Sequence, residues 1–397
     1  MNKIKSLSVV KSLLMLFVII MFLFPVCLAQ DESEDIEAVD DLEETTDEIE
    51  DERIVITELY VDSDDEMIVS DRALILTGNI TVMNASELMI TSSDIQLSIR
   101  GERSYNVSIL DEGNMIISNS TLNTLSDASL VKLLDNGQLK VINSNLTDFK
   151  SLSTSGNSTL IVQGSRVNIN NIICTGKNIS FTESSMPSGD LNVTVTEVKL
   201  EDFIGDNIFL DMNNSVLKSI QCNLLKIRTV DSVYLNESKI KNCEIESQNE
   251  TFVVDSTFES LTLNSSGIAI NVSTSEGGAR AGGAIRAAEN STTKIMRYWY
   301  LTLNVTEMAG LGIPAKITVE DYFGNTILEG KSDVYGLYME PIIAEIINST
   351  KTVFVGNYKV KATYANVTTK YTPIVLDRNI DIDLKFRSPI PLETSTK

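Results

Sequence analysis

Apolar and polar residues alternate along much of the chain in a short pattern. In the stretch 138–146, QLKVINSNL, apolar residues stand at Leu139 and Val141, a serine follows at Ser144, and Leu146 is again apolar. The alternating half predicts a strand with one buried face, because successive strand side chains point to opposite sides. The interruption predicts a turn whose serine hydroxyl bonds the local backbone.

The same pattern, Φ-x-Φ-x-x-Ser-x-Φ with Φ apolar, occurs in nine copies between residues 88 and 258. Its serine position is filled by Ser93, Ser120, Ser144, Ser165, Ser184, Thr196, Ser215, Ser238 and Ser256. The mean spacing of about 20 residues lies in the range of solenoid repeats. A single copy has too few apolar residues to bury itself, so stacked copies must share one core. The repeat therefore predicts a parallel β-solenoid.

An antiparallel meander is the alternative architecture. It requires tight turns of the Asn-Gly type, and only residues 134–139, LDNGQL, clearly offer one. The segments MIISNSTL (115–122) and KVINSNL (140–146) resemble the rungs of right-handed β-helix proteins, particularly archaeal secreted ones. This resemblance covers about half of the chain and implies a fold rather than an activity.

A second β-rich segment follows the repeat. In residues 297–305, RYWYLTLNV, the side chains of Trp299, Leu301, Leu303 and Val305 share one face of a predicted strand. Gly324-Asn325 predicts a hairpin turn further along.

This second segment resembles the transthyretin-like or carboxypeptidase-regulatory β-sandwiches of surface proteins. The matching residues are Gly312-Ile313-Pro314, Asp321 to Asn325, Ser332-Asp333-Val334-Tyr335-Gly336 and Tyr358-Lys359-Val360. The resemblance implies structural support or adhesion without catalytic residues. The expected fold class is all-β, with a parallel β-helix followed by a small Ig-like or transthyretin-like sandwich.

The N-terminus reads as a targeting segment. Lys3, Lys5 and Lys11 precede the apolar residues 12–26, and small residues stand before Gln30. We expect cleavage there, with an uncleaved signal anchor or a lipid-modified Cys27 as alternatives. The rest of the chain is then expected to be secreted or on the extracellular surface, touching a membrane only through residues 1–29 if these are retained.

The predicted domain map has six parts. They are a signal peptide or anchor (1–29), an acidic disordered spacer (30–53), the β-helix (54–273), a Gly/Ala-rich linker (274–293), the sandwich (294–386) and a flexible tail (387–397).

The net charge of the chain restricts the classes of partner that it can bind. The chain carries 55 acidic and 32 basic residues, a formal net charge of −23, which argues against nucleic acid because that partner needs a basic surface. Fourteen of the acids lie in residues 31–52, where self-repulsion predicts a solvated spacer. A tail that binds cations or a protein partner is the alternative for this segment.

Glycosylation sequons are abundant. Of 32 asparagines, 17 stand in Asn-X-Ser/Thr, well above the six or seven, roughly, that the Ser/Thr content gives by chance. They are Asn79, Asn84, Asn106, Asn119, Asn145, Asn157, Asn178, Asn192, Asn213, Asn236, Asn249, Asn264, Asn271, Asn290, Asn304, Asn348 and Asn366. We expect a surface glycoprotein.

Candidate chemistry is sparse. The chain has no histidine, which removes histidine-based nucleophile systems and metal sites. The densest acidic group within the repeat is Glu201, Asp202, Asp206 and Asp211, which are candidates for acid–base hydrolysis of a glycosidic bond or solvated charges between rungs. Asp62, Asp64 and Glu66 have calcium-loop offsets but lack the loop glycine, since Met67 stands there.

The remaining cysteines, Cys174, Cys222 and Cys243, are odd in number and lack CxxC spacing, so buried thiols are expected rather than disulfides or zinc ligands. No cofactor is expected.

Two functional classes are consistent with these features. The first is a non-catalytic structural or adhesive surface glycoprotein, a rigid rod presenting a sandwich module to cell-envelope components, other surface proteins or glycans. The second is a carbohydrate-active β-helix enzyme, such as a polysaccharide lyase or glycosidase. Sequons spread along the whole repeat favour the first class, because glycans would obstruct a long substrate groove.

Overall fold

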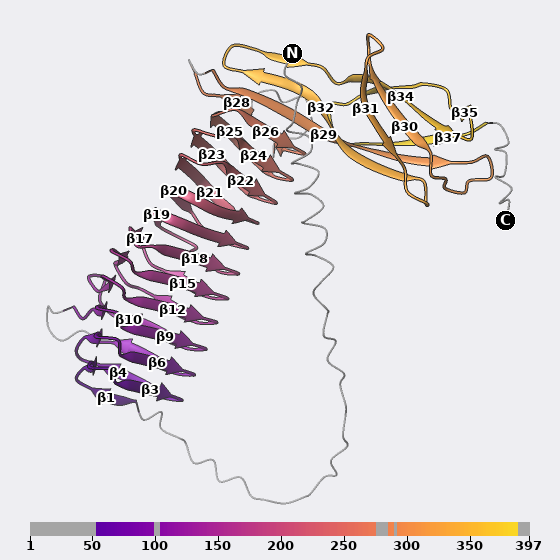
Figure 1. Ribbon diagram of the computed structural model, residues 1–397. Helices are drawn as coiled ribbons and strands as arrows, with labels where there is room; N and C mark the ends of the chain where they lie inside the picture. Colours follow the sequence, from indigo (N-terminus) through magenta and orange to yellow (C-terminus); the bar gives the residue numbers. More distant parts are fainter. Residues whose placement is uncertain (1–52, 99–103, 275–284, 290–291, 388–397) are drawn as a thin grey trace, which may run out of the picture. The chain divides into compact units, whose positions relative to one another are not determined.

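A computed structural model describes residues 53–98, 104–274, 285–289 and 292–387. These residues form strands and no helix, so within them no helix is available to cross a membrane. Most of them build a parallel β-solenoid of about 11 turns (Figure 1), which confirms the expected fold class. The predicted signal, nearly all of the acidic spacer, much of the predicted linker and residues 388–397 lie outside the described residues.

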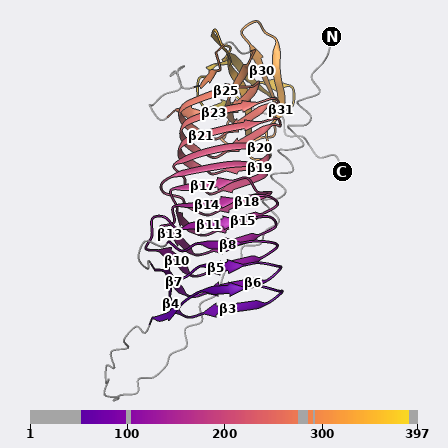
Figure 2. The same ribbon diagram turned by 90° about the vertical axis from the view of Figure 1, so that its left-hand side faces the viewer.

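Each early coil gives one strand to each of three parallel sheets (Figure 2). Sheet I contains β1 (Ile54–Ile56), β4 (Ala73–Leu76), β7 (Asp94–Leu97), β10 (Thr121–Thr124), β13 (Asn145–Thr147) and β16 (Arg166–Asn168). Sheet II contains β2 (Leu59–Val61), β5 (Ile80–Val82), β8 (Val107–Ile109), β11 (Leu130–Leu133), β14 (Ser151–Thr154) and β17 (Asn171–Cys174). Sheet III contains β3 (Glu66–Ser70), β6 (Glu87–Thr91), β9 (Asn114–Ser118), β12 (Gln138–Ile142), β15 (Thr159–Gln163) and β18 (Asn178–Thr182).

In later coils the strands lengthen and pass through two sheets. β19 (Asp190–Glu201) and β20 (Asn207–Lys218) run through sheets II and III. β21 (Gln221–Thr229), β23 (Lys239–Ser247) and β25 (Thr257–Asn264) continue sheet II, while β22 (Val233–Asn236), β24 (Thr251–Val254) and β26 (Gly267–Ile270) continue sheet III.

The core follows the alternation in the sequence. Leu139 stacks in register on Met115 and Leu160, and Leu146 stacks on Leu122 and Val167. All of these side chains are buried in one continuous hydrophobic cluster. Stacked coils therefore share a core that no single coil could form.

The repeat serines form a ladder at the corner between sheets III and I. The Ser144 hydroxyl donates to the carbonyl of Ile142 at 2.6 Å and accepts the backbone N–H of Ser120 at 3.1 Å. Ser144 in turn donates its own N–H to the Ser165 hydroxyl at 3.0 Å. The predicted local bond is thus confirmed, and a second bond that joins successive coils accompanies it.

The residue before each ladder position has a left-handed backbone. This column is Asp71, Ser92, Asn119, Asn143, Gly164, Glu183, Asp202, Ser219, Glu237, Asp255 and Asn271, with φ between 48° and 57°. Ten of its members are not glycine, so L residues adopt this conformation at nearly every coil. The neighbouring ladder bonds offset the usual cost of about 1–2 kcal/mol.

Two of the nine predicted copies were placed at the wrong corner. Thr196 and Ser215 lie at the passage from sheet II to sheet III, where Ser215 pairs with Val198. The ladder positions of those coils are Phe203 and Ile220, which follow the left-handed Asp202 and Ser219. Apolar residues replace serine there, so the serine rule could not find them.

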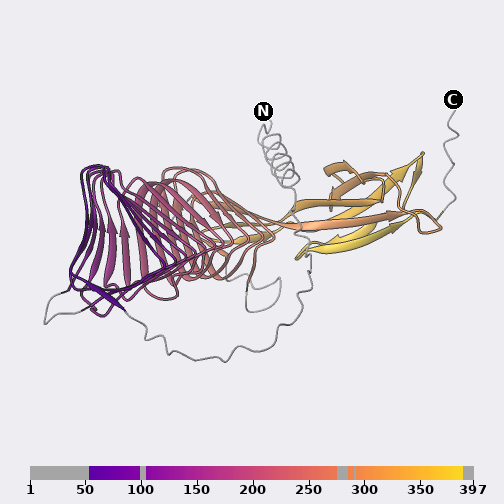
Figure 3. The same cartoon turned by 90° about the horizontal axis from the view of Figure 1, so that it is seen from below.

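The end of the solenoid is continuous with the C-terminal module. β28 (Ile285–Ala287), which lies within the predicted linker, pairs with β25, and β27 (Ser273–Thr274) does so as well. β29 (Lys294–Thr306) pairs with β26 over residues 295–298 and with β32 (Leu337–Asn348) over residues 294–304. It pairs with β37 (Ile380–Lys385) from residue 301 onward (Figure 3). One strand thus belongs to both parts.

The C-terminal module has two sheets. One contains β29, β32, β33 (Thr352–Phe354) and β37; the other contains β30 (Lys316–Asp321), β31 (Thr326–Lys331), β34 (Asn357–Tyr364), β35 (Val367–Thr368) and β36 (Thr372–Val375). Both contribute to a single hydrophobic cluster that includes Trp299, Leu301, Ile317 and Val360. The predicted hairpin at Gly324-Asn325 joins β30 and β31. The transthyretin-like assignment stays a prediction.

Candidate functional site

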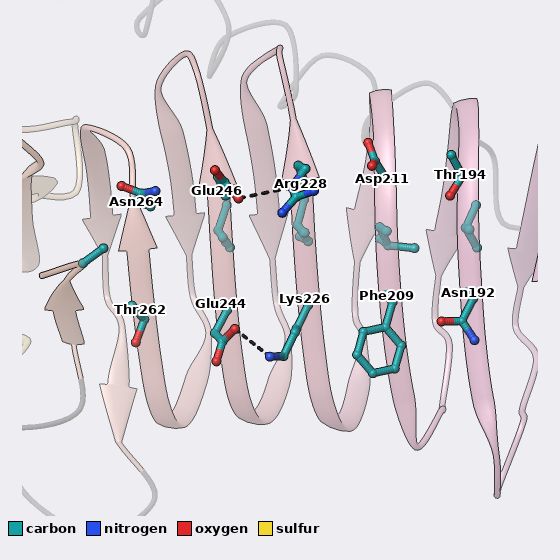
Figure 4. Close-up of a pocket in the computed structure, with 15 residues that line it drawn as sticks. Asn192, Thr194, Phe209, Asp211, Lys226, Arg228, Glu244, Glu246, Thr262 and Asn264 are labelled. Carbon is teal, nitrogen blue, oxygen red and sulfur yellow. Dashed lines mark hydrogen bonds and ion pairs between the residues drawn. The ribbon is translucent and has the colours of Figure 1, made fainter. Parts of the chain in front are cut away.

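A shallow groove lies on the outer surface of sheet II (Figure 4). It has a volume of about 570 Å³ and crosses β19, β20, β21, β23 and β25. Two columns of outward side chains line it, because every second residue of these strands faces solvent. The first is Asn192, Phe209, Lys226, Glu244 and Thr262, and the second is Thr194, Asp211, Arg228, Glu246 and Asn264.

Ion pairs between successive coils dominate this groove. The Lys226 Nζ atom lies 2.8 Å from a carboxylate oxygen of Glu244, and the Arg228 Nε atom lies 3.2 Å from one of Glu246. Lys226 is half-buried and the other three side chains are exposed, so each pair contributes no more than about 1 kcal/mol to stability. Such pairs exchange readily with water and can bind a polar ligand only weakly.

Sequence reasoning missed these four charges, although a signal was present. Lys226 and Arg228 precede Glu244 and Glu246 by 18 residues, which is also the separation between Ser238 and Ser256 in the serine ladder. Knowledge of the local coil length would have placed opposite charges side by side on the same face.

The four acidic candidates are spread over two coils. Only Asp211 lines the groove. Glu201 ends β19 and pairs with Lys199 at 2.9 Å. Asp202 occupies the left-handed turn column, and the Asp206 carboxylate accepts a 2.7 Å bond from the Asn223 amide. Glu201 is thus held by an ion pair within its strand and Asp206 by a bond between coils, and a catalytic role for the four residues stays a prediction.

The calcium candidates lie at the turn between β2 and β3. Asp62 accepts a 2.6 Å hydrogen bond from the side-chain amide of Asn84 in the next coil, and this bond lowers the pKa of Asp62. Asp64 has a left-handed backbone, and Glu66 begins β3. Within the described residues, no three His, Cys, Asp or Glu side chains gather as metal ligands would. Calcium binding stays a prediction.

The three cysteines are buried free thiols, as expected. Burial raises the pKa of Cys174 and Cys222 to about 12. Protonated thiols of this kind are poor nucleophiles, so they serve as small core residues.

Most sequon asparagines of the solenoid lie at corners and strand ends, and three further sequons lie in the C-terminal module. Asn290 lies outside the described residues. Some side chains are already bonded: the amide of Asn271 donates to Asp255 at 2.6 Å, and that of Asn304 donates to Asp383 at 3.0 Å. Asn192 and Asn264 both line the sheet II groove. Glycans at these two positions would restrict access to it.

No known family model matches the chain, and no curated protein matches its sequence. Among solved structures it is similar to a mutant of the shaft pilin spaA from Lactobacillus rhamnosus GG, with 14% identity over 22% of this chain and a TM-score of 0.19. It is also similar to the TIE protein of Bacillus anthracis, with 17% identity over 26% of this chain and a TM-score of 0.18. The matches span 46% and 18% of those chains. At such TM-scores neither likeness supports an argument about fold or function.

Proposed function

We propose that this protein is a non-catalytic structural or adhesive glycoprotein of the cell surface. In this proposal the solenoid is a rigid spacer that presents the C-terminal module to envelope components or neighbouring proteins. The observation that carries the proposal is the serine ladder, which ties most successive coils together by backbone-to-hydroxyl bonds of 3.0–3.3 Å. About 11 coils at roughly 4.8 Å each give a spacer of about 50 Å.

The groove on sheet II supports the same proposal. Its basic residues are paired with glutamates of the same face, and its sequons would place glycans along it. A surface of this kind suits weak contacts with envelope glycans or neighbouring proteins, and it needs no cofactor.

Surface exposure on intact cells is the first test. Antibodies or a membrane-impermeant label should reach the solenoid without permeabilisation, and the intact mass of the native protein should report signal removal and glycan number together. Labelling only after permeabilisation would contradict the proposal.

A carbohydrate-active enzyme is the second candidate, since Asp211, Arg228 and Phe209 share one groove. Purified protein should then release reducing ends or unsaturated products from envelope polysaccharides, and Asp211→Asn should abolish that release. Under the structural proposal, neither the unchanged protein nor the Asp211→Asn variant releases such products.

A further inference from the structure

An apolar stripe runs along the outer surface of sheet III. The middle outward position of successive strands is filled by Ile68, Met89, Ile116, Lys140, Ile161, Ser180, Lys199, Val216, Tyr234, Phe252, Ile268 and Met296. Nine of the twelve are apolar or aromatic, at positions where an isolated solenoid would gain solubility from polar residues. We call this column the sheet III stripe.

The sheet III stripe is accessible. Ile68, Val216 and Tyr234 are 58%, 52% and 47% exposed, and the rings of Tyr234 and Phe252 stack at 4.7 Å with an interplanar angle of 2°. A hollow of about 680 Å³ lies over Ile161, Lys199 and Val216. The stripe is interrupted by Lys140, Ser180 and Lys199, but a column of partly exposed apolar residues of this length marks an interaction site.

We propose that the sheet III stripe binds the same stripe of a second copy of this chain, with the two solenoids antiparallel. The two-fold axis runs along the strands and passes between β18 and the second half of β19. This axis reverses the order of the coils, so the first stripe residue meets the last. The interface is isologous, as in most dimers.

The order of residues in the stripe is self-complementary under this axis. Ile68 meets Met296, Met89 meets Ile268, Ile116 meets Phe252, and Ile161 meets Val216. The polar members also find suitable partners. Lys140 meets the ring of Tyr234, a cation–π arrangement, and Lys199 meets Ser180 beside the axis.

The neighbouring outward column agrees with the same axis. Among the parallel strands, the first residue of this column is Glu66 and the last is Lys294. These two residues meet under the proposed axis, and both are exposed. A parallel arrangement of the two solenoids would instead place Lys140 against Lys140 and Lys199 against Lys199. Like charges in direct contact are unfavourable. The antiparallel pairing keeps the two Lys140 side chains far apart, and Lys199, which lies beside the axis, already pairs with Glu201 at 2.9 Å, so charge favours the antiparallel pairing.

The available area is sufficient. Twelve strands at roughly 4.8 Å and three outward columns spaced by roughly 6.7 Å give about 700–800 Å² per copy. Stable protein interfaces bury about 800 Å² per partner.

Sequons on sheet III constrain the proposal. Asn178 is exposed and lies on the same strand as Ser180, facing outward close to the proposed axis. Asn236 ends β22 and faces outward on the same sheet, and Asn249 lines the hollow beside Val216. Glycans at these positions would block the contact, so these sequons must be empty in the dimer.

Sedimentation equilibrium of the full chain, made in a host without N-glycosylation, tests association. We expect a dimer between about 1 and 100 µM and at least a 100-fold weaker association for Val216→Arg. The control is Ile173→Arg, which changes an exposed apolar residue on sheet II and should leave the dimer intact. A monomer at all concentrations would overturn the proposal. Association that Val216→Arg does not weaken would overturn it as well, because another part of the chain, such as residues 1–29, would then cause it.

Cross-linking tests the direction of pairing. Chains carrying Ile161→Cys and chains carrying Val216→Cys should form a disulfide with each other when mixed and little when separate. The native cysteines are buried and should not react. Efficient cross-linking of each variant with itself would indicate the parallel arrangement and refute the antiparallel one.

Discussion

The solenoid and the C-terminal module both turn β-strands back on themselves, but they use different residues to do so. At the solenoid's ladder corner, Asp, Asn, Ser and Glu adopt left-handed backbones, and hydroxyl groups of the next coil bond the adjacent N–H groups. In the module, Gly310, Gly324 and Gly336 fill turn positions with φ of 94°, 90° and 83°. Repetition lets neighbouring solenoid turns support one another. Three of the module's turns depend on a glycine of their own, while the turn between β34 and β35 uses Ala365 and Asn366.

The largest expected effect follows from this difference. A Cβ atom at Gly336 would lie 2.1 Å from the carbonyl oxygen of Val305, a backbone atom that cannot move without disturbing β29. We expect Gly336→Ala to cost more than about 5 kcal/mol and to unfold the module. The single tryptophan, Trp299, lies in the module core, so its fluorescence reports this loss.

Gly164→Ala is the matched change in the solenoid. The added Cβ would meet the side-chain oxygen of Asn143 at 2.3 Å, and that side chain can rotate away. L residues already occupy this column in the adjacent coils, so a cost of about 1–2 kcal/mol is expected. Equal losses for the two glycines would show that the ladder gives its turns no special tolerance.

The second prediction concerns the stacked core. Leu146 is buried between Leu122 and Val167, so Leu146→Ala should cost about 2–5 kcal/mol through lost burial and a cavity. Its neighbour Asn145 is exposed, and Asn145→Gln should cost under about 0.5 kcal/mol. Thermal unfolding of both variants, made without glycans, compares their stabilities. A larger loss of stability for Asn145→Gln would show that the assigned strand register is wrong.

The third prediction isolates one step of the ladder. Ser144→Ala removes the acceptor of the Ser120 N–H and should cost about 1–3 kcal/mol, since that buried donor keeps no partner. Ser153→Ala changes an outward serine on β14 and should alter the free energy of unfolding by no more than about 0.5 kcal/mol. Chemical denaturation measures both. Indistinguishable midpoints would mean that the ladder bonds do not stabilise the solenoid.

The sequence alone predicts the features that a local pattern encodes, and it does not predict those that depend on which coils are neighbours. The alternation and Ser144 identified the strands and the ladder corner, because burial imposes period two wherever one face meets a core. Phe203 and Ile220 were missed because the ladder position there carries no hydroxyl. Asp202 was read as a candidate acid, since a left-handed turn residue and a catalytic carboxylate look alike before the register is known. Finding the groove and the sheet III stripe requires knowing which residues of separate coils are neighbours.

The smallest expected effect is a pH dependence confined to the module. The Glu320 carboxylate accepts a hydrogen bond from the Tyr371 hydroxyl and lies near the ammonium groups of Lys359 and Lys361. The Tyr371 bond first, and then the lysines, lower the pKa of Glu320 to about 2. The resulting stabilisation is complete above the ordinary carboxyl pKa, because Glu320 is then ionised in both states. As the pH falls below about 4.3, the unfolded chain binds a proton first, and the stabilisation is gone once the pH passes about 2.

Acid unfolding followed by Trp299 fluorescence measures this effect against the many other carboxylates of the chain. Glu320→Gln should flatten the loss of module stability between about pH 4.3 and pH 2 relative to the unchanged protein. Tyr371→Phe removes the strongest contribution to the lowered pKa, so its loss of stability should still begin near about pH 4.3 but should be smaller and should end at a higher pH. The solenoid, followed by far-UV circular dichroism, should respond to acid equally in all three proteins. Glu320→Gln and the unchanged protein could instead unfold along the same acid profile. The contacts of Glu320 with Tyr371 and Lys361 would then not stabilise the folded module. These contacts would contribute as little as the exposed ion pairs of the sheet II groove.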